Sequence, residues 1–228
     1  MGFLFDSLQH LLAREPETRR AALARMIGRG LGVSPVRLSP APGPPGPGAR
    51  APDTTTAGAG PTKASPEAEP GEASPDFGIW HAPKAALRPF AVTWTVGLSG
   101  SQDRELIALT LADSSSPEQD RFAGLLAAVA AAGSGAGPPI VLPEGTLGRS
   151  SHTRALVVPG AWPLRDEDEY ARILGAPLQL VIPVTTREAA WIEARGPDAY
   201  IEAMKAQQVS PWADRVPGET ELPPLLDQ

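Results

Sequence analysis

Ser150, Ser151 and His152 are adjacent in the sequence, and Asp166 and Asp168 follow them along the chain. These residue types could form a hydrolase triad, in which a nucleophile, a base and an orienting acid converge in space. No G-x-S-x-G nucleophile elbow is present, and adjacent side chains on a strand point to opposite faces. We therefore interpret the segment as a polar entry to a strand and expect no catalytic residues, with a hydrolase acting through His152 as an alternative.

Asp166, Glu167, Asp168 and Glu169 form a continuous run of carboxylates that could collect a hard cation. A calcium loop needs oxygen ligands at alternating positions, a glycine turn and a distal glutamate, and this run lacks the glycine and the glutamate. We interpret it as a solvated acidic loop or helical turn. Because charge of one sign steers encounter, we expect the run to face a basic protein partner.

The histidines give no metal site in the sequence. His10, His81 and His152 are widely separated, and the chain contains no cysteine, so no zinc-ligand spacing is present. The glycine-rich run that starts at Gly133 follows a helical pattern and leads into Pro138–Pro139, whereas a phosphate-binding loop follows a strand and opens a helix. We expect neither a metal nor a cofactor.

The charge is unevenly distributed along the chain. The net charge is −6, and residues 1–40 contribute six arginines against Asp6, Glu15 and Glu17, a net of +3, so the remainder carries −9. An acidic main body argues against a nucleic-acid partner, because phosphate contacts need clustered Lys and Arg.

Composition also bears on location. No stretch of about 18 apolar residues occurs, so we expect no membrane span. The absence of cysteine is compatible with a reducing compartment, and we expect a cytoplasmic protein. The Ala, Pro and Gly content, with few lysines, is typical of a GC-rich bacterial genome.

The first zone, residues 1–33, has the pattern of an amphipathic helical segment. Five apolar residues recur at three- and four-residue spacing and share one helical face: Phe3, Leu4, Leu8, Leu11 and Leu12. A second short helix is expected to begin at Pro16 and to end at Gly28–Gly32. The segment could pack on its own domain, self-associate, lie on a membrane surface or dock to a partner. We take the five residues as candidate partner contacts.

The second zone, residues 34–75, is expected to be a disordered linker rich in Pro, Gly and Ala. Between residues 41 and 75, 29 of 35 residues are Ala, Pro, Gly, Ser or Thr, and none is Val, Ile, Leu or aromatic. Such a segment cannot bury enough apolar surface to offset the entropy lost on ordering. Its prolines should keep it extended.

The third zone, residues 76–216, is expected to form one folded domain, followed by a flexible tail at 217–228. Alternating or continuous apolar runs predict strands at 90–96, 105–111, 154–158 and 177–184. Helices are expected at 117–132, 185–195 and 197–207, with Thr185 and Glu188 forming a capping box. This order favours an α+β fold, with a mixed sheet and helices mainly on one face.

The third zone resembles the suppressor-of-fused (SUFU) family. The segment LQLVIPVTTREAAWIEARGPDAYIEAM places Pro183, Glu188 and Gly196 as the family places a strand-ending proline, a first-turn glutamate and a glycine break. The segments PPIVLPEGTLGRSSHTRALVVPGAWPL and FAVTWTV, with Phe77–Gly78, are similar to other parts of the domain. The resemblance covers about 140 residues.

The resemblance implies a non-enzymatic protein-binding module without a cofactor. Animal members of the family sequester transcription factors by clamping a short peptide, and bacterial members often resemble immunity proteins that neutralise a toxin. We therefore expect a toxin or effector protein as the partner. The alternative is an adaptor or secretion-associated protein whose N-terminal helices dock to a second partner. The oligomeric state is left open.

Overall fold

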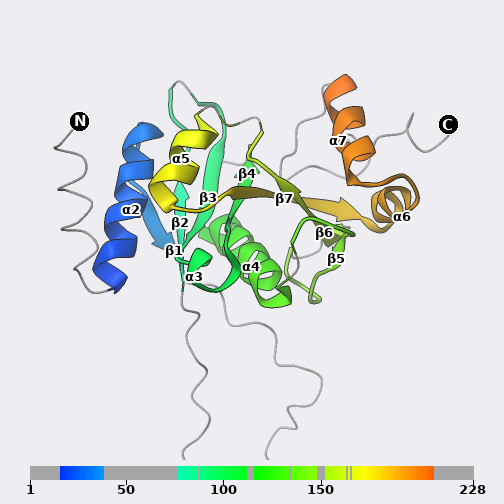
Figure 1. The fold of residues 1–228 in the computed structure, drawn as a ribbon, viewed down its shortest axis with the longest axis horizontal. Coiled ribbons are helices and arrows are strands. Elements are labelled where there is room, and N and C mark those ends of the chain that lie inside the picture. Colours follow the sequence, from blue (N-terminus) through cyan, green and yellow to red (C-terminus); the bar gives the residue numbers. More distant parts are fainter. Residues whose placement is uncertain are drawn as a thin grey trace, which may run out of the picture.

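The computed structural model describes residues 16–38, 77–86, 88–111, 116–133, 135–147, 152–162, 164 and 166–207. Helices and strands alternate irregularly along these residues (Figure 1). Their bounds are α2 (Pro16–Gly30), β1 (Val36–Leu38), β2 (Gly78–Ala82), β3 (Ala91–Val96), α3 (Ser99–Gln102), β4 (Glu105–Thr110), α4 (Ser116–Ala132), β5 (Ile140–Val141), β6 (His152–Pro159), α5 (Glu167–Leu174), β7 (Leu178–Thr185), α6 (Thr186–Arg195) and α7 (Pro197–Ala206).

Within the described residues, the strands form one seven-stranded sheet in the order β1-β2-β3-β4-β7-β6-β5. The pairing of β4 with β7 is parallel, and the other pairings are antiparallel. The sheet is therefore mixed, with a crossover between β4 and β7 that passes through α4 and the β5–β6 hairpin.

The helices divide unequally between the two faces of the sheet. Helix α4 alone covers one face, where Phe122, Leu126 and Val129 belong to a core with Leu106 and Val157. Helices α2, α5, α6 and α7 contribute to the core on the opposite face, with α2 and α5 at one end and α6 and α7 at the other (Figure 1). The predicted α+β fold, with a mixed sheet and helices mainly on one face, is confirmed.

Strand β7 lies near the middle of the sheet. Leu178, Leu180, Ile182 and Val184 join the core under the four helices, whereas Val181 joins the core under α4. Burial on both faces explains why this strand reads as an almost continuous apolar run rather than an alternating one.

The predicted capping box at the start of α6 is present. The Thr185 hydroxyl accepts a hydrogen bond from the Glu188 backbone N–H at 3.2 Å, and the Glu188 carboxylate accepts one from the Thr185 N–H at 2.7 Å. The other carboxylate oxygen of Glu188 accepts a hydrogen bond from the Tyr200 hydroxyl at 2.7 Å. This single buried glutamate therefore fixes both the start of α6 and the position of α7.

The structure corrects the sequence interpretation of residues 16–38, which placed 1–33 in a separate segment and 34–75 in a linker. Helix α2 buries Ala24, Ile27 and Leu31 in the domain core. Strand β1 pairs with β2, with Leu38 opposite Ile79. Three residues are too few to show a period, so no local pattern predicts β1.

This pairing changes the interpretation of the Pro/Gly/Ala-rich segment, most of which lies outside the described residues. Its two ends, Leu38 and Gly78, belong to adjacent antiparallel strands of one sheet. The segment is therefore a long connection within one sheet and does not join two separate bodies.

Candidate functional site

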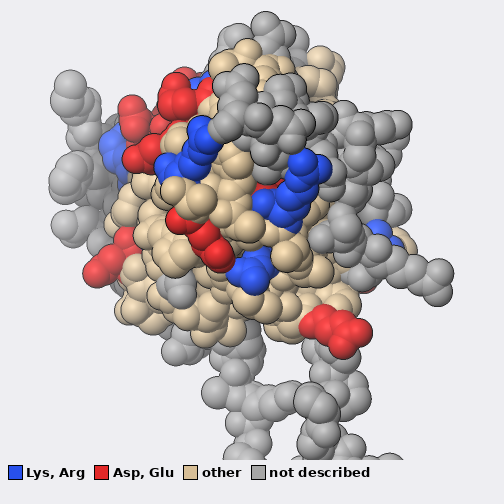
Figure 2. Space-filling model, turned by 90° about the vertical axis from the view of Figure 1, so that its right-hand side faces the viewer, with Lys and Arg blue, Asp and Glu red and all other residues tan. Residues whose placement is uncertain are grey.

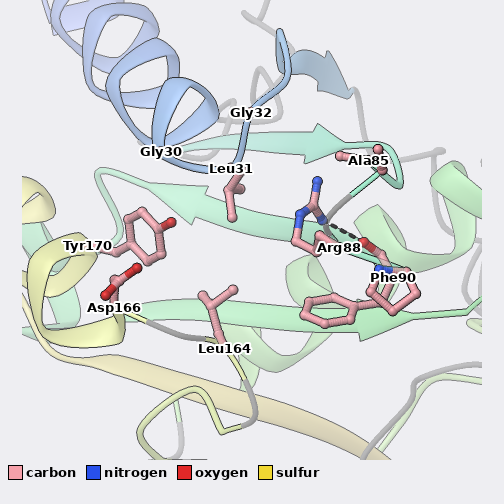
Figure 3. Close-up of a pocket in the computed structure, with 11 residues that line it drawn as sticks. Gly30, Leu31, Gly32, Ala85, Arg88, Phe90, Leu164, Asp166 and Tyr170 are labelled. Atoms are coloured by element: carbon pink, nitrogen blue, oxygen red, sulfur yellow. Dashed lines mark hydrogen bonds between the residues drawn. The ribbon is translucent and has the colours of Figure 1, made fainter.

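A hollow of about 600 Å³ lies where the end of α2, the β2–β3 connection and the segment leading into α5 meet (Figure 3). Its volume is within the range of roughly 300–1,000 Å³ that is usual for small-ligand pockets. The lining residues are Gly30, Leu31, Gly32, Ala85, Ala86, Arg88, Pro89, Phe90, Leu164, Asp166 and Tyr170. Most of them are apolar, and three carry polar or charged side chains.

Glycines at the end of α2 allow the close packing that forms one wall of the hollow. A Cβ on Gly30 would lie 3.0 Å from Cε1 of the Tyr170 ring. A Cβ on Gly28 would lie 2.4 Å from Cδ of Pro35 and 2.8 Å from the Val33 carbonyl oxygen. The glycine-rich end predicted for this helix thus brings α2 against α5, beyond simply stopping the helix.

Arg88 enters the hollow from the β2–β3 connection and is only 8% exposed. Its Nη1 donates to the Phe90 carbonyl and its Nη2 to the Pro83 carbonyl, both at 2.6 Å. Its Nε is buried and has no hydrogen-bond partner. None of the carboxylates that the structure describes forms an ion pair with Arg88. The guanidinium is therefore a buried cation that neutral carbonyl groups hold in place.

The electrostatics of this region follow from burial. Burial lowers the pKa of Arg88. Burial first, and the Asp166 carboxylate second, raise the pKa of Tyr170. Behind the hollow, burial and then the charge of Arg88 lower the pKa of His81 to about 4, so the ring is neutral at pH 7. The Nδ1 atom of His81 lies 2.9 Å from the Thr93 hydroxyl.

The four predicted acidic residues lie at the start of α5, beside the hollow. Asp166 precedes the helix with a left-handed backbone, φ +62°, which aspartate tolerates better than most residues. Asp168 and Glu169 are exposed, and Glu169 pairs with Arg172 at 3.5 Å. Glu167 is half-buried and accepts a hydrogen bond from the Ala161 N–H at 2.5 Å.

The run therefore divides into two parts. Glu167 has a structural role, because it ties the first turn of α5 to the end of β6. The other three carboxylates remain exposed to solvent. The remaining candidate contacts, Phe3, Leu4, Leu8, Leu11 and Leu12, lie outside the described residues.

The structure separates the parts of the possible triad. His152 begins β6 and is buried opposite Thr185, whereas the bond between Glu167 and Ala161 holds Asp166 near the other end of that strand. An eight-residue strand is about 23 Å long. His152 and Asp166 therefore do not converge, and Ser150 and Ser151 lie outside the described residues.

Neither a metal site nor a membrane-spanning helix is found among the described residues. No group of three or more His, Asp or Glu side chains among them is arranged to hold a metal ion. None of the described helices is long and apolar enough to cross a bilayer.

Arg88 and Tyr170 are the residues that sequence reasoning did not identify. Arg88 lies in the segment AALRPF, where nothing in the local sequence indicates that the guanidinium is buried without a carboxylate. Tyr170 directly follows the acidic run. The only available signal was an arginine flanked by apolar residues in a loop.

The end of the molecule that carries α6 and α7 has a different surface. Figure 2 shows Lys and Arg interspersed with Asp and Glu on this face, without one large patch of a single sign. Arg154 and Glu193, for example, form an ion pair at 3.0 Å. Compared with this surface, the start of α5 carries a run of consecutive carboxylates.

Comparison with known proteins places the fold. No family model matches the chain, and no curated protein matches it. A solved structure described as a SUFU (suppressor of fused protein) homologue from Neisseria gonorrhoeae FA 1090 matches with a TM-score of 0.51 and 15% sequence identity. The match covers 62% of this chain and 78% of that chain. At this identity the likeness concerns the fold, and the chain has a SUFU-like fold, which confirms the predicted resemblance.

Proposed function

We propose that this chain is a non-enzymatic protein-binding module that sequesters a partner protein by covering its active surface. The SUFU-like fold supports this proposal, because the family resemblance implies protein binding without a cofactor. The observation that carries the proposal is the combination of this fold with exposed carboxylates gathered at one end of α5.

The carboxylates favour a partner with a basic surface. Asp166, Asp168 and Glu169 lie within one helical turn and are exposed. Arg172 pairs with only one of them, Glu169. A charge cluster of one sign raises the rate of encounter with an oppositely charged surface, and salt screens the effect. The partner face that meets α5 would therefore carry Lys or Arg.

The finer proposal is an immunity protein that neutralises a bacterial toxin in the cytoplasm. Occlusion needs no catalytic group in the binding protein, only a surface complementary to the toxin. In the adaptor alternative, docking to a second partner would fall to the chain before Pro16, because α2 is packed into the domain core.

Co-purification of the full chain from native expression at low salt, followed by mass spectrometry, tests the proposal. A stoichiometric protein partner is expected, and a toxin among the captured proteins would support immunity. The D168K/E169K variant should lower the association rate about ten-fold at low salt and much less at high salt. The matched control is E144K, which changes one exposed carboxylate near β5, at the far edge of the sheet.

Different results would refute the sequestering function and the assignment of α5 as the contact surface. Recovery of no protein partner under these conditions would overturn the sequestering function. Recovery of a partner that binds both variants equally would retain the function and reject α5 as the contact surface.

A further inference from the structure

The hollow contains a buried positive charge without a described counter-charge. Arg88 is 8% exposed, and its two terminal nitrogens bind the carbonyls of Pro83 and Phe90. Carbonyl groups satisfy the donors but do not neutralise the charge. Buried charges in proteins are ordinarily paired, because removing an ion from water is costly. An anion bound in the hollow would therefore interact more favourably with Arg88 than it would in water.

One polar group of the hollow has unused hydrogen-bonding capacity. The Tyr170 hydroxyl makes no hydrogen bond to a described residue, whereas the Nε of Arg88 is unpaired but buried away from solvent. In Figure 3 the two side chains lie on opposite sides of the hollow, and the Tyr170 hydroxyl points toward the side of Arg88.

The rest of the wall is apolar. Leu31 and Leu164 project between Arg88 and Tyr170 from two different elements, and the Phe90 ring lies beside Arg88 (Figure 3). An apolar wall with a few converging polar groups is the usual form of a small-molecule site. Asp166 lies on the Tyr170 side of the hollow, away from Arg88. A negatively charged group would therefore favour the Arg88 side.

We propose that the hollow binds a small monocarboxylate with an apolar body, whose carboxylate lies beside the Arg88 guanidinium and accepts a hydrogen bond from the Tyr170 hydroxyl. The apolar body lies against Leu31, Leu164 and Phe90. This site shares Asp166 with the proposed partner surface, whereas Asp168 and Glu169 of that surface do not line the hollow. It gives the protein a second binding activity, for a ligand of low molecular mass.

The two tyrosines of the chain provide a direct test. Tyr170 lines the hollow, whereas Tyr200, a residue of α7, is buried in the core and donates to Glu188. The full chain labelled with 3-fluorotyrosine gives two ¹⁹F resonances, which the Y170F variant assigns. Titration with octanoate should shift the Tyr170 resonance and leave the Tyr200 resonance unchanged. Octan-1-ol should bind at least ten-fold more weakly, and octylamine should not bind at the Tyr170 site.

Three variants examine the roles of the side chains by calorimetric titration with octanoate. Y170F should weaken binding about three- to ten-fold, because it removes one donor and keeps the ring. D166N should strengthen binding about two-fold, because it removes a negative charge from the wall, and asparagine tolerates the left-handed backbone. The control E144Q should leave the affinity unchanged.

R88K keeps a positive charge but removes the planar guanidinium that the Pro83 and Phe90 carbonyls hold in place, and it should weaken binding ten-fold or more. If this variant does not fold, Y170F and D166N still decide the matter. Equal binding of octanoate and octan-1-ol, equal shifts of both tyrosine resonances, or no shift at millimolar octanoate would each overturn the proposal. Capture of a protein partner is a separate result, and it neither rescues nor removes the carboxylate site.

Discussion

Shortening the connection between β1 and β2 should stabilise the domain. The change replaces residues 41–75 with Gly-Asn-Gly and retains Ser39, Pro40, Asp76 and Phe77. The remaining connection is long enough to keep Leu38 opposite Ile79. It shortens from residues 39–77 to about seven residues, a length compatible with a hairpin loop.

The magnitude follows from the entropy of loop closure. The cost of closing a flexible loop grows as (3/2)RT ln n. Reducing n from about 39 to about 7 therefore recovers about 1.5 kcal/mol of unfolding free energy. For an m-value of about 2 kcal/mol/M in urea, the midpoint should rise by about 0.7 M. A segment that merely joined two independent bodies would produce no such gain.

Urea denaturation followed by tryptophan fluorescence measures the effect. The control replaces residues 41–75 with a Gly/Ser segment of equal length, which should leave the midpoint nearly unchanged. Unchanged stability of the shortened variant would refute the loop-closure reasoning. A loss of more than about 1 kcal/mol, with loss of hydrogen-exchange protection in Val36–Leu38, would show that the deleted residues support β1.

Three further predictions concern stability. G28A should destabilise the domain by about 1–3 kcal/mol, because the added Cβ would overlap Pro35. The control G100A adds a Cβ in open space and should leave the stability unchanged. Denaturant midpoints of the two variants measure the difference. His81 has a folded-state pKa of about 4, below the unfolded value of about 6.5, so the unfolded state binds more protons between these values. Stability should therefore be full above pH 6.5 and fall by on the order of 3 kcal/mol toward pH 4, and H81Q should flatten this slope in pH-dependent melts. E105Q should cost about 2–3 kcal/mol in thermal denaturation, because the buried Glu105 carboxylate accepts three hydrogen bonds around the β3–β4 connection; no change would contradict its structural role.

Much of the central fold could be predicted from local pattern. The apolar runs located β3, β4, β6 and β7, and the capping residues located α6. These signals arise from neighbouring residues: alternation along a strand, or a hydroxyl three residues before a glutamate. The helix predicted to begin at Pro16 and to end at Gly28–Gly32 was likewise correct in position.

The errors occurred where long-range packing decides the structure. Strand β1 exists because β2 offers it an edge, and Arg37 of that strand also pairs with Glu17 of α2. The deciding partners of β1 therefore lie far away in the sequence. The acidic run was predicted as a loop or a helical turn, and the helical alternative is correct, because Glu167, Asp168 and Glu169 lie in the first turn of α5, where negative charge favourably meets the helix dipole.

The sequence by itself determined the α+β class, the main strands and the acidic charge of the body, because these depend on composition and short-range periodicity. Its resemblance to the SUFU family indicated the SUFU-like fold. Only the tertiary structure decided that α2 belongs to the domain and that the Pro/Gly/Ala-rich segment connects adjacent strands. It alone brought Arg88 and Tyr170 to one hollow. They are separated by some eighty residues in the chain, and each becomes informative only through its burial and its distance from the other, which no local pattern encodes.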